Sequence, residues 1–354
     1  GHFTDDNKVL EFINSNDLNR LAPMGTSCPD HFLRTKIKPL ILALNPEDDL
    51  MDTSAVLEKI TPSFEQYRKD YQEYYDSCKR SDSPAIRDAN PVVILYPGVG
   101  MFTFAKNKQT ARVASEFYIN AVNVMRGAEA ISKYTSLPRQ EAFDIEYWLL
   151  EEAKLQRQPK EKPLSRKVAL ITGSGGGIGR AIADKLIYEG ATVVFTDISE
   201  DYLKEATAQY SPDQAIACQC DVTRAESIEA AVQKASLQFG GLDIVVHSAG
   251  LAISKPVEDT TETDWDLLQD VLVKGQFLLS RAVAKIMRKQ NLEGNIINIV
   301  SKNGLVSGPN NAGYGTAKAA QMHMSRLLAT ELAPDQIRVN TVNPDGVIIG
   351  SKIW

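Results

Sequence analysis

Short apolar stretches alternate with longer amphipathic ones along the second half of the chain. The apolar stretches, rich in Val, Ile and Leu, predict strands at 167–172, 192–197, 215–219, 243–247, 295–300 and 337–342. Helical patterns lie near 178–189, 201–209, 224–238, 264–289 and 313–333. This alternation predicts a doubly wound parallel sheet with helices on both faces, and continuous apolar strands fit a sheet buried on both sides.

The pattern in the first part of the chain is less regular. It predicts strands near 39–44 and 92–96, and helices near 53–59, 63–78, 107–134 and 140–155. A polar stretch with two prolines, "QRQPKEKPLSR" at 156–166, separates the two patterns. We therefore expect a smaller α/β domain at 1–158, a linker at 159–166 and the doubly wound domain at 167–354.

Composition narrows the classes of partner. The net charge of −6 is shared evenly between the two parts, so neither carries the basic excess of a nucleic-acid-binding domain. No apolar run approaches the roughly 18 residues of a membrane-spanning helix. The cysteines, Cys28, Cys78, Cys218 and Cys220, have no disulfide-framework spacing. We expect a cytoplasmic protein that acts on a small molecule, with neither a nucleic acid nor a membrane as partner.

A glycine-rich turn, "TGSGGGIGRA", follows the first strand of the second part. Gly173 permits a tight turn, Gly177 lets the backbone approach a pyrophosphate, and Gly179 lets the helix pack on the strand. The free N–H groups at the helix start point at the phosphate. Gly173, Ser174, Gly177, Ile178 and Gly179 are therefore predicted to bind a dinucleotide, with a purely structural turn as the alternative.

The next strand indicates which dinucleotide. It ends in Asp197, 18 residues after Gly179, where an acid accepts hydrogen bonds from the adenosine ribose and repels a 2′-phosphate. No Lys or Arg occupies 173–179. The prediction is NAD rather than NADP, although Asp197 could also cap the following helix. Asp221, after the third strand, is expected near the adenine or as another helix cap.

Candidate catalytic residues follow the fifth strand. Tyr314 and Lys318 are four residues apart and share one face of a predicted helix, and Ser301 follows a buried strand. A tyrosine with a pKa near ~10 is a poor base, so we expect a neighbouring ammonium and a cationic nicotinamide to lower that pKa. Tyr314 could then exchange a proton with an alcohol while hydride is transferred, and Ser301 could hold the substrate oxygen.

In combination, these residues resemble the short-chain dehydrogenase/reductase family. The matching elements are Thr172-Gly173, Gly177-Ile178-Gly179, Asp197, Asp221-Val222, Ala249-Gly250, Ser301, Tyr314, Lys318 and "IRVNTVNP" at 337–344. The resemblance implies a Rossmann-type fold, NAD(P) and hydride transfer. It adds Val222, Ala249 and Gly250 to the cofactor site, and it implies that Tyr314 contacts the cofactor and Lys318 its nicotinamide ribose. It also implies a homo-oligomer paired through the helices near 264–289 and 313–333.

Three departures from the family pattern stand out. His247-Ser248 replaces the usual Asn pair before Ala249, and Leu272 replaces the Asn that supports a water relay to the lysine. The chain stops at Trp354, soon after the sixth strand, so we expect a C-terminally truncated domain whose substrate pocket is open.

The first part resembles a narrower group, the bifunctional rhamnulose-1-phosphate aldolase/alcohol dehydrogenase proteins. The resemblance rests on "LAPMGTSCPDHFLRTKIKP", "PGVGMFTFAKNKQTARVASEFYINAVNVMRGAEAI" and "LPRQEAFDIEYWLLEEAKLQRQP", together with "VNPDGVIIGSKIW". It implies a class II aldolase half, and a dehydrogenase half that oxidises lactaldehyde to lactate in rhamnose catabolism.

An aldolase metal site is not expected in this chain. Only His2 and His31 precede the linker, whereas a zinc site needs about three protein ligands. The stretch "PGVGMFTFA" aligns with the metal-binding turn of class II aldolases and has Val99 where a metal-binding histidine would stand. Gly98 and Gly100 lack the nearby helix start that a phosphate would require, so we interpret this stretch as a degenerate aldolase element.

The sequence thus favours an NAD-dependent dehydrogenase of a small alcohol or hydroxy-aldehyde. A 3-oxoacyl or sugar reductase of the same family, or a non-catalytic NAD-binding or assembly module, remains as the alternative.

Overall fold

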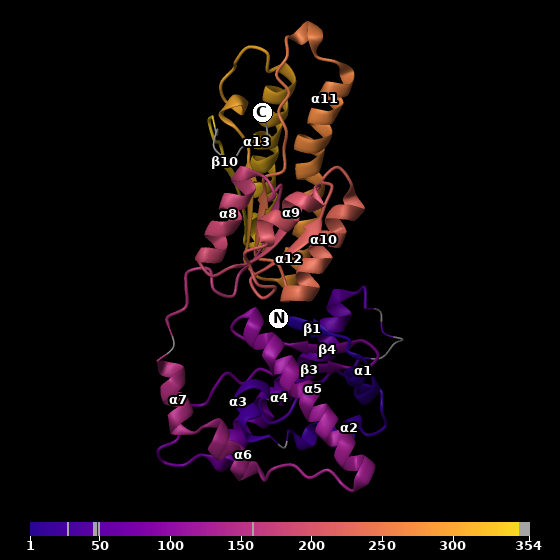
Figure 1. Ribbon diagram of the computed structural model, residues 1–354, viewed down its shortest axis with the longest axis vertical. Coiled ribbons are helices and arrows are strands. Elements are labelled where there is room, and N and C mark those ends of the chain that lie inside the picture. Colours follow the sequence, from indigo (N-terminus) through magenta and orange to yellow (C-terminus); the bar gives the residue numbers. More distant parts are fainter. Residues whose placement is uncertain (27, 45–47, 49, 158, 347–354) are drawn as a thin grey trace. The chain divides into compact units, whose positions relative to one another are not determined.

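The chain divides into two compact units, Gly1–Lys160 and Glu161–Trp354, which Figure 1 draws in sequence colours. The computed structural model describes residues 1–26, 28–44, 48, 50–157 and 159–346. Each unit has its own sheet and its own core, so each is considered by itself.

The first unit is built on a mixed four-stranded sheet. Its strands are β1 (His2–Thr4), β2 (Leu40–Ile41), β3 (Val93–Tyr96) and β4 (Gly100–Thr103), in the order β1-β4-β3-β2. Strand β4 runs antiparallel to both neighbours, and β2 is parallel to β3. Helices α1 (Asn7–Ile13) and α5 (Lys108–Ile131) share an apolar core with β3 and β4, through side chains such as Phe12, Leu95 and Val122. The short helices α2 (Leu18–Leu21) and α3 (Phe32–Thr35) complete this region.

The glycines of "PGVG" form the hairpin between β3 and β4. Gly98 has a φ of +79°, and a Cβ on Gly100 would lie 2.6 Å from the carbonyl oxygen of Thr4 on β1. The next helix, α5, begins only at Lys108, after the Asn107 side chain caps it. These glycines therefore serve close strand packing, and the helix that follows them in sequence begins only at Lys108.

Two helices of the first unit differ from the sequence prediction. Helix α4 (Thr53–Cys78) is continuous through Pro62, where we predicted two helices. Proline has a helical φ and removes only one backbone donor, and Tyr67, Tyr71 and Tyr74 then bury one face of the helix. The helix predicted at 140–155 is broken into α6 (Arg139–Glu146) and α7 (Leu149–Gln156). The break coincides with Tyr147, whose ring is buried and stacked on Phe143.

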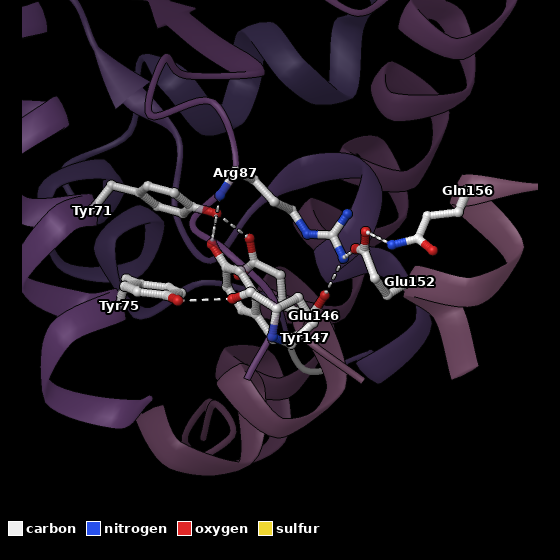
Figure 2. Close-up of polar contacts among 8 residues, drawn as sticks. Tyr71, Tyr75, Arg87, Glu146, Tyr147, Glu152 and Gln156 are labelled. Carbon is white, nitrogen blue, oxygen red and sulfur yellow. Dashed lines mark hydrogen bonds and ion pairs between the residues drawn. The ribbon is translucent and has the colours of Figure 1, made fainter. Parts of the chain in front are cut away.

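A buried carboxylate joins α4 to the end of α6 (Figure 2). The hydroxyl of Tyr71 donates to Oε1 of Glu146 at 2.6 Å and lies 2.8 Å from the hydroxyl of Tyr147. Arg87 Nη2 donates to the Glu146 carbonyl oxygen at 3.1 Å and pairs with Glu152 of α7 at 3.2 Å. Burial raises the pKa of the Glu146 carboxyl. Because its contacts come from α4, α6, α7 and the segment around Arg87, this cluster holds those elements together.

The second unit contains a six-stranded, wholly parallel sheet. The strands are β5 (Val168–Thr172), β6 (Thr192–Asp197), β7 (Ala215–Gln219), β8 (Ile244–His247), β9 (Gly294–Ile299) and β10 (Ile337–Val342). Their order is β10-β9-β8-β5-β6-β7, so the winding reverses direction between β5 and β8. This is the doubly wound arrangement predicted from the sequence, and ligands of such sheets bind where the strand order reverses.

Helices cover both faces of this sheet (Figure 1). Helices α8 (Gly177–Tyr188) and α9 (Glu200–Thr207) pack on one face, and α10 (Ala225–Phe239), α12 (Gly275–Gln290) and α13 (Ala312–Leu332) pack on the other. The helix predicted at 264–289 is α11 (Glu262–Leu268) followed by a π-helical turn, Gln269–Lys274, that runs into α12. Across the residues that the structure describes, no helix combines the length and apolar character needed to cross a membrane.

Candidate active site

A cavity of about 250 Å³ opens at the carboxyl ends of β8 and β9. Ser301 comes from the segment after β9, Tyr314 and Lys318 from α13, and Ile178 from the first turn of α8. The structure therefore brings the three predicted catalytic side chains together with the start of the helix that follows the glycine turn.

The catalytic candidates differ in exposure and contacts. Lys318 is 4% exposed, and its Nζ donates to the Ile299 carbonyl oxygen at 3.3 Å and lies 5.6 Å from the centre of the Tyr314 ring. Ser301 is hydrogen-bonded to Tyr314, and its Oγ also accepts from the backbone N–H of Asn303 at 3.2 Å. Ser301 and Tyr314 can thus reach one substrate oxygen from the same side.

Burial changes the pKa values of both Tyr314 and Lys318. Burial raises the pKa of Tyr314, and the hydrogen bond from Ser301 only partly opposes it. The same burial lowers the pKa of Lys318 to about 8. We predicted that the lysine and a cationic nicotinamide would together lower the tyrosine pKa, and this stays a prediction for the cofactor-bound protein. The ammonium of Lys318 is itself partly neutral in slightly alkaline solution.

Backbone atoms of neighbouring segments pack closely against the glycine turn. Gly173 has a φ of +65°, and a Cβ there would lie 2.7 Å from Cα of Ala249. A Cβ on Gly179 would lie 2.4 Å from the carbonyl oxygen of Gly173. Gly177 is the first residue of α8, where backbone N–H groups have no partner inside the helix. This donor set fits a pyrophosphate.

Asp197 lies at the end of β6, beside the turn. One carboxylate oxygen accepts from the N–H of Gly175 at 3.1 Å, and the other accepts from the N–H of Ser199 at 3.1 Å. Ser174 is fully buried, and its hydroxyl donates to the Thr196 carbonyl oxygen at 3.2 Å. Ser174 therefore ties the turn to β6 and faces away from solvent.

The other predicted cofactor residues lie around neighbouring strand ends. Asp221 Oδ1 accepts from the N–H and hydroxyl of Thr223 at 2.9 and 2.7 Å, which matches the helix-cap alternative. Val222 is buried against Gly275. The N–H of Ala249 donates to Thr172 Oγ1 at 3.1 Å, and Gly250 lines the cavity. The side chains of Asp221, Val222 and Ala249 do not line the cavity.

Several polar residues of the cavity were not predicted. They are Ser248, Ser254, Lys302, Asn303, Asn311 and Asp345. Lys302 Nζ pairs with Asp345 at 2.5 Å, and this pairing lowers the pKa of the Asp345 carboxyl. The sequence could have indicated these residues only through their position. Several of them follow the carboxyl ends of β8, β9 and β10, where doubly wound sheets bind ligands.

Two of the four histidines are buried. His31 is buried and stacks on Phe117 with ring centres 4.2 Å apart. His247 is fully buried on β8. Among the described residues, no group of three or more His, Cys, Asp or Glu side chains is arranged to hold a metal ion.

Comparisons with known proteins agree with this geometry. Residues 167–350 match the family model described as short chain dehydrogenase. The chain belongs to the short-chain dehydrogenase family. Residues 1–155 match the model described as aldolase class II, second domain. Membership of the family confirms the predicted α/β fold class, the order of an aldolase-type domain before a short-chain dehydrogenase domain, and the prediction of an oxidoreductase.

Individual relatives of this short-chain dehydrogenase carry oxidoreductase names. The uncharacterized oxidoreductase YuxG of Bacillus subtilis (strain 168) is 38% identical over 99% of this chain and 51% of its own length, so the chain spans about half of that relative. The NAD-dependent glycerol dehydrogenase of Listeria innocua is 34% identical over 55% of this chain and 77% of its own. A crystal structure of NAD⁺-bound xylitol dehydrogenase is 35% identical, with a TM-score of 0.50 over 52% of this chain and 72% of that one.

Proposed function

We propose that the second unit transfers hydride between NAD and a small alcohol or hydroxy-aldehyde. The observation that carries this proposal is the single cavity shared by Ser301, Tyr314, Lys318 and the first turn of α8. Oxidation of lactaldehyde in rhamnose catabolism is the specific reaction we propose, on the basis of the sequence resemblance given above.

Each side chain has a defined role in this proposal. Bound NAD would supply the hydride acceptor. Tyr314 takes the proton of a hydroxyl on the carbon that loses hydride, either the hydroxyl of an alcohol or that of the hydrate formed when water adds to an aldehyde, and returns it in the reverse direction. Ser301 donates to the substrate oxygen and orients it. Lys318 offers a buried positive charge 5.6 Å from the Tyr314 ring, which favours the phenolate during proton transfer.

The cofactor proposed is NAD rather than NADP. Asp197 is the acid at the end of β6, and its carboxylate is fixed by two backbone N–H groups. A Cβ on Gly175 would lie 3.0 Å from that carboxylate and 2.5 Å from Cβ of Tyr202, so the turn and the acid are in close contact. A 2′-phosphate beside Asp197 would meet charge repulsion in a tightly packed corner.

A polyol is the second candidate substrate. The cavity presents hydroxyl, amide and charged groups from Ser254, Asn303, Asn311 and the Lys302–Asp345 pair, which suit a molecule with several hydroxyls. The relatives named for glycerol, D-threitol and xylitol have substrates of this kind. A long acyl substrate, as for a 3-oxoacyl reductase, fits this polar lining less well.

The experiment is a cofactor and substrate panel on the whole chain. NADH formation is followed with lactaldehyde, glycerol, threitol and xylitol, each with NAD and with NADP. We expect NAD-dependent turnover of at least one of them, and we expect Asp197→Ala to narrow the preference for NAD over NADP by at least tenfold. Tighter binding of NADP than NAD by the wild type would overturn the role of Asp197. NAD binding without turnover of any alcohol would favour the non-catalytic module.

Two broader properties are also part of this proposal. Homo-oligomers pair through α11, α12 and α13, which expose Trp265, Phe277 and Leu327. A cytoplasmic location is supported by four cysteines that are all free. No aldolase activity is proposed for this chain.

A further inference from the structure

Asn311 is a polar residue of the catalytic cavity to which the mechanism proposed above gives no role. It lines the cavity together with Ser301 and Tyr314, and it is the N-cap residue of α13. An asparagine at an N-cap ordinarily accepts a hydrogen bond from the second or third helical N–H, which in α13 belongs to Gly313 or Tyr314. The Asn311 side chain makes no such bond. Its amide is therefore not used to begin the helix.

The segments around Asn311 hold it at the cavity. It precedes Tyr314 by three residues, so both side chains start from the same end of α13. The backbone N–H of Lys255 donates to the carbonyl oxygen of Asn310 at 3.0 Å, which ties the segment after β8 to the residue before Asn311. A Cβ on Gly308 would lie 3.5 Å from Nδ2 of Asn311, so the segment after β9 passes close to the amide. These contacts restrict where the Asn311 side chain can point.

Asn303 brings a second amide to the same cavity. A Cβ on Gly315 would lie 3.3 Å from the carbonyl oxygen of Asn303, so the turn that follows Ser301 packs directly on the first turn of α13. Each side-chain amide has an oxygen that accepts and an NH₂ group that donates. Asn303 and Asn311 therefore offer both kinds of hydrogen bond beside the residues that hold the reacting oxygen.

The charged groups of the cavity already have partners. Lys302 pairs with Asp345 at 2.5 Å, and Lys318 donates to the Ile299 carbonyl oxygen at 3.3 Å. Among the described residues that line the cavity, these two lysines and Asp345 are the only charged ones. A substrate carboxylate would have to displace Asp345 from Lys302, whereas a hydroxyl can donate to one amide and accept from the other. The amides thus match an uncharged, hydroxylated part of a substrate.

We propose that Asn311 is a specificity-determining residue that binds a second hydroxyl of the substrate, on the carbon next to the one that loses hydride, with Asn303 as its partner. The inference rests on the proposed function, because it assigns the part of the substrate that Ser301 and Tyr314 do not hold. The cavity of about 250 Å³ is smaller than the roughly 300–1,000 Å³ of ordinary ligand pockets, so the two hydroxyls are close together. A substrate without the second hydroxyl would leave the amide unpaired.

The kinetic test uses two substrate pairs that differ by one hydroxyl, on the whole chain with NAD. The pairs are lactaldehyde with propanal, and propane-1,2-diol with propan-1-ol. In the wild type we expect kcat/KM to be about tenfold or more higher for the hydroxylated member of each pair. Asn311→Leu keeps the size of the side chain but loses both hydrogen-bonding groups, so it should bring the two members within about twofold, mainly through KM. Lactate, whose second group is a carboxylate, should not be oxidised.

Asn310→Gly is the matched control for this substitution. Asn310 has a φ of +60°, which glycine adopts without strain, and its side chain does not line the cavity, so the variant should keep the wild-type preference.

Two further measurements need no turnover. NADH fluorescence gives the affinity of the NADH-bound chain for propane-1,2-diol and propan-1-ol, and it should show the same preference and the same loss in Asn311→Leu. Thermal unfolding separates this role from helix capping. Asn311→Ala should keep the midpoint of the second unit within about 1 °C, whereas Thr261→Ala should lower it by about 2–4 °C, because Thr261 caps α11 in a capping box.

Each outcome supports or overturns the role of Asn311. A wild type that treats both members of each pair alike would overturn it, and so would a preference that survives in Asn311→Leu and Asn311→Ala. If the leucine variant fails to fold, the alanine variant decides. An equal loss of preference in Asn310→Gly, or oxidation of lactate as fast as of the diol, would also overturn it. A midpoint that falls as far in Asn311→Ala as in Thr261→Ala would assign Asn311 to capping. Absence of turnover with every substrate would count against the proposed function, and diol binding to the NADH-bound chain would then decide the inference.

Discussion

At the scale of single residues, the site combines groups that burial has moved away from their ordinary pKa values. Lys318 is charged at neutral pH although it is almost fully buried, and Tyr314 is harder to ionise than a tyrosine in water. A buried ammonium costs stability, and such costs are common where chemistry requires the charge. The cost of burying this charge predicts that the free energy of unfolding depends measurably on pH.

Lys318→Met should stabilise the second unit at neutral pH while abolishing turnover. The pKa of Lys318 falls to about 8 in the folded chain, against about 10.4 unfolded, so the charged side chain costs up to about 3 kcal/mol. That cost is complete below pH 8, where both states are protonated, and it vanishes as pH rises through the unfolded value. The stability gained by Lys318→Met should therefore be largest below pH 8 and fade between pH 8 and about 10.4.

Denaturant unfolding across this pH range measures that difference. Lys285→Met, at an exposed position of α12, is the control and should change the free energy of unfolding by less than about 0.5 kcal/mol at any pH. A Lys318→Met gain that grows with rising pH would contradict the account.

At the scale of elements, Gly173 and Gly179 let backbone segments of the β5–turn–α8 unit pack closely, and we propose that this unit positions the cofactor. A Cβ at Gly179 would lie 2.4 Å from the Gly173 carbonyl oxygen, whereas one at Gly176 would lie 3.4 Å from the same atom. The first distance requires the turn to move, and the second is an ordinary contact. The two positions are three residues apart and provide a matched comparison.

Gly179→Ser should weaken NAD binding at least tenfold and lower stability by about 1–3 kcal/mol, because the added atoms overpack the turn. Gly176→Ser should bind NAD within about threefold of the wild type, since Gly176 is the N-cap of α8 and serine is a good residue there. Titration of NAD by fluorescence and thermal unfolding give both quantities. Equal losses in the two variants would show that the close contact is not what matters.

Much of the second unit could be predicted because most of its strands are rich in Val, Ile and Leu and its glycine turn follows the first strand directly. The burial of Gln276 and Gln321 could not be predicted, because it depends on how α12 and α13 are rotated over the sheet. In the first unit, Pro62 suggested a helix break that the tyrosines of α4 override. The burial that raises the Tyr314 pKa in the chain alone could not be predicted either, because burial is a property of the fold and not of the Tyr-Lys spacing.

At the scale of the whole molecule, the chain joins a class II aldolase second domain to a short-chain dehydrogenase domain. Each unit has a separate core. Trp265 on α11 and Phe277 on α12 have exposed side chains, and we propose that two copies pair through this apolar surface.

Phe277→Glu should shift the protein to a smaller oligomer. Phe277 is 49% exposed, and a carboxylate in a paired apolar surface would be left desolvated. Light scattering coupled to gel filtration measures the mass. Tyr188→Glu, at a 67% exposed position of α8 outside the proposed interface, should leave the mass unchanged. A monomeric wild type would contradict the proposed pairing.

The central claim is that Tyr314 exchanges the proton during NAD-dependent oxidation of a small hydroxylated substrate. The most direct measurement compares NADH formation by wild type and Tyr314→Phe, with NAD affinity measured on the same samples. We predict that kcat/KM falls by a factor of about 10²–10⁴ while the Kd for NAD changes less than threefold. Undiminished turnover by Tyr314→Phe would contradict the account.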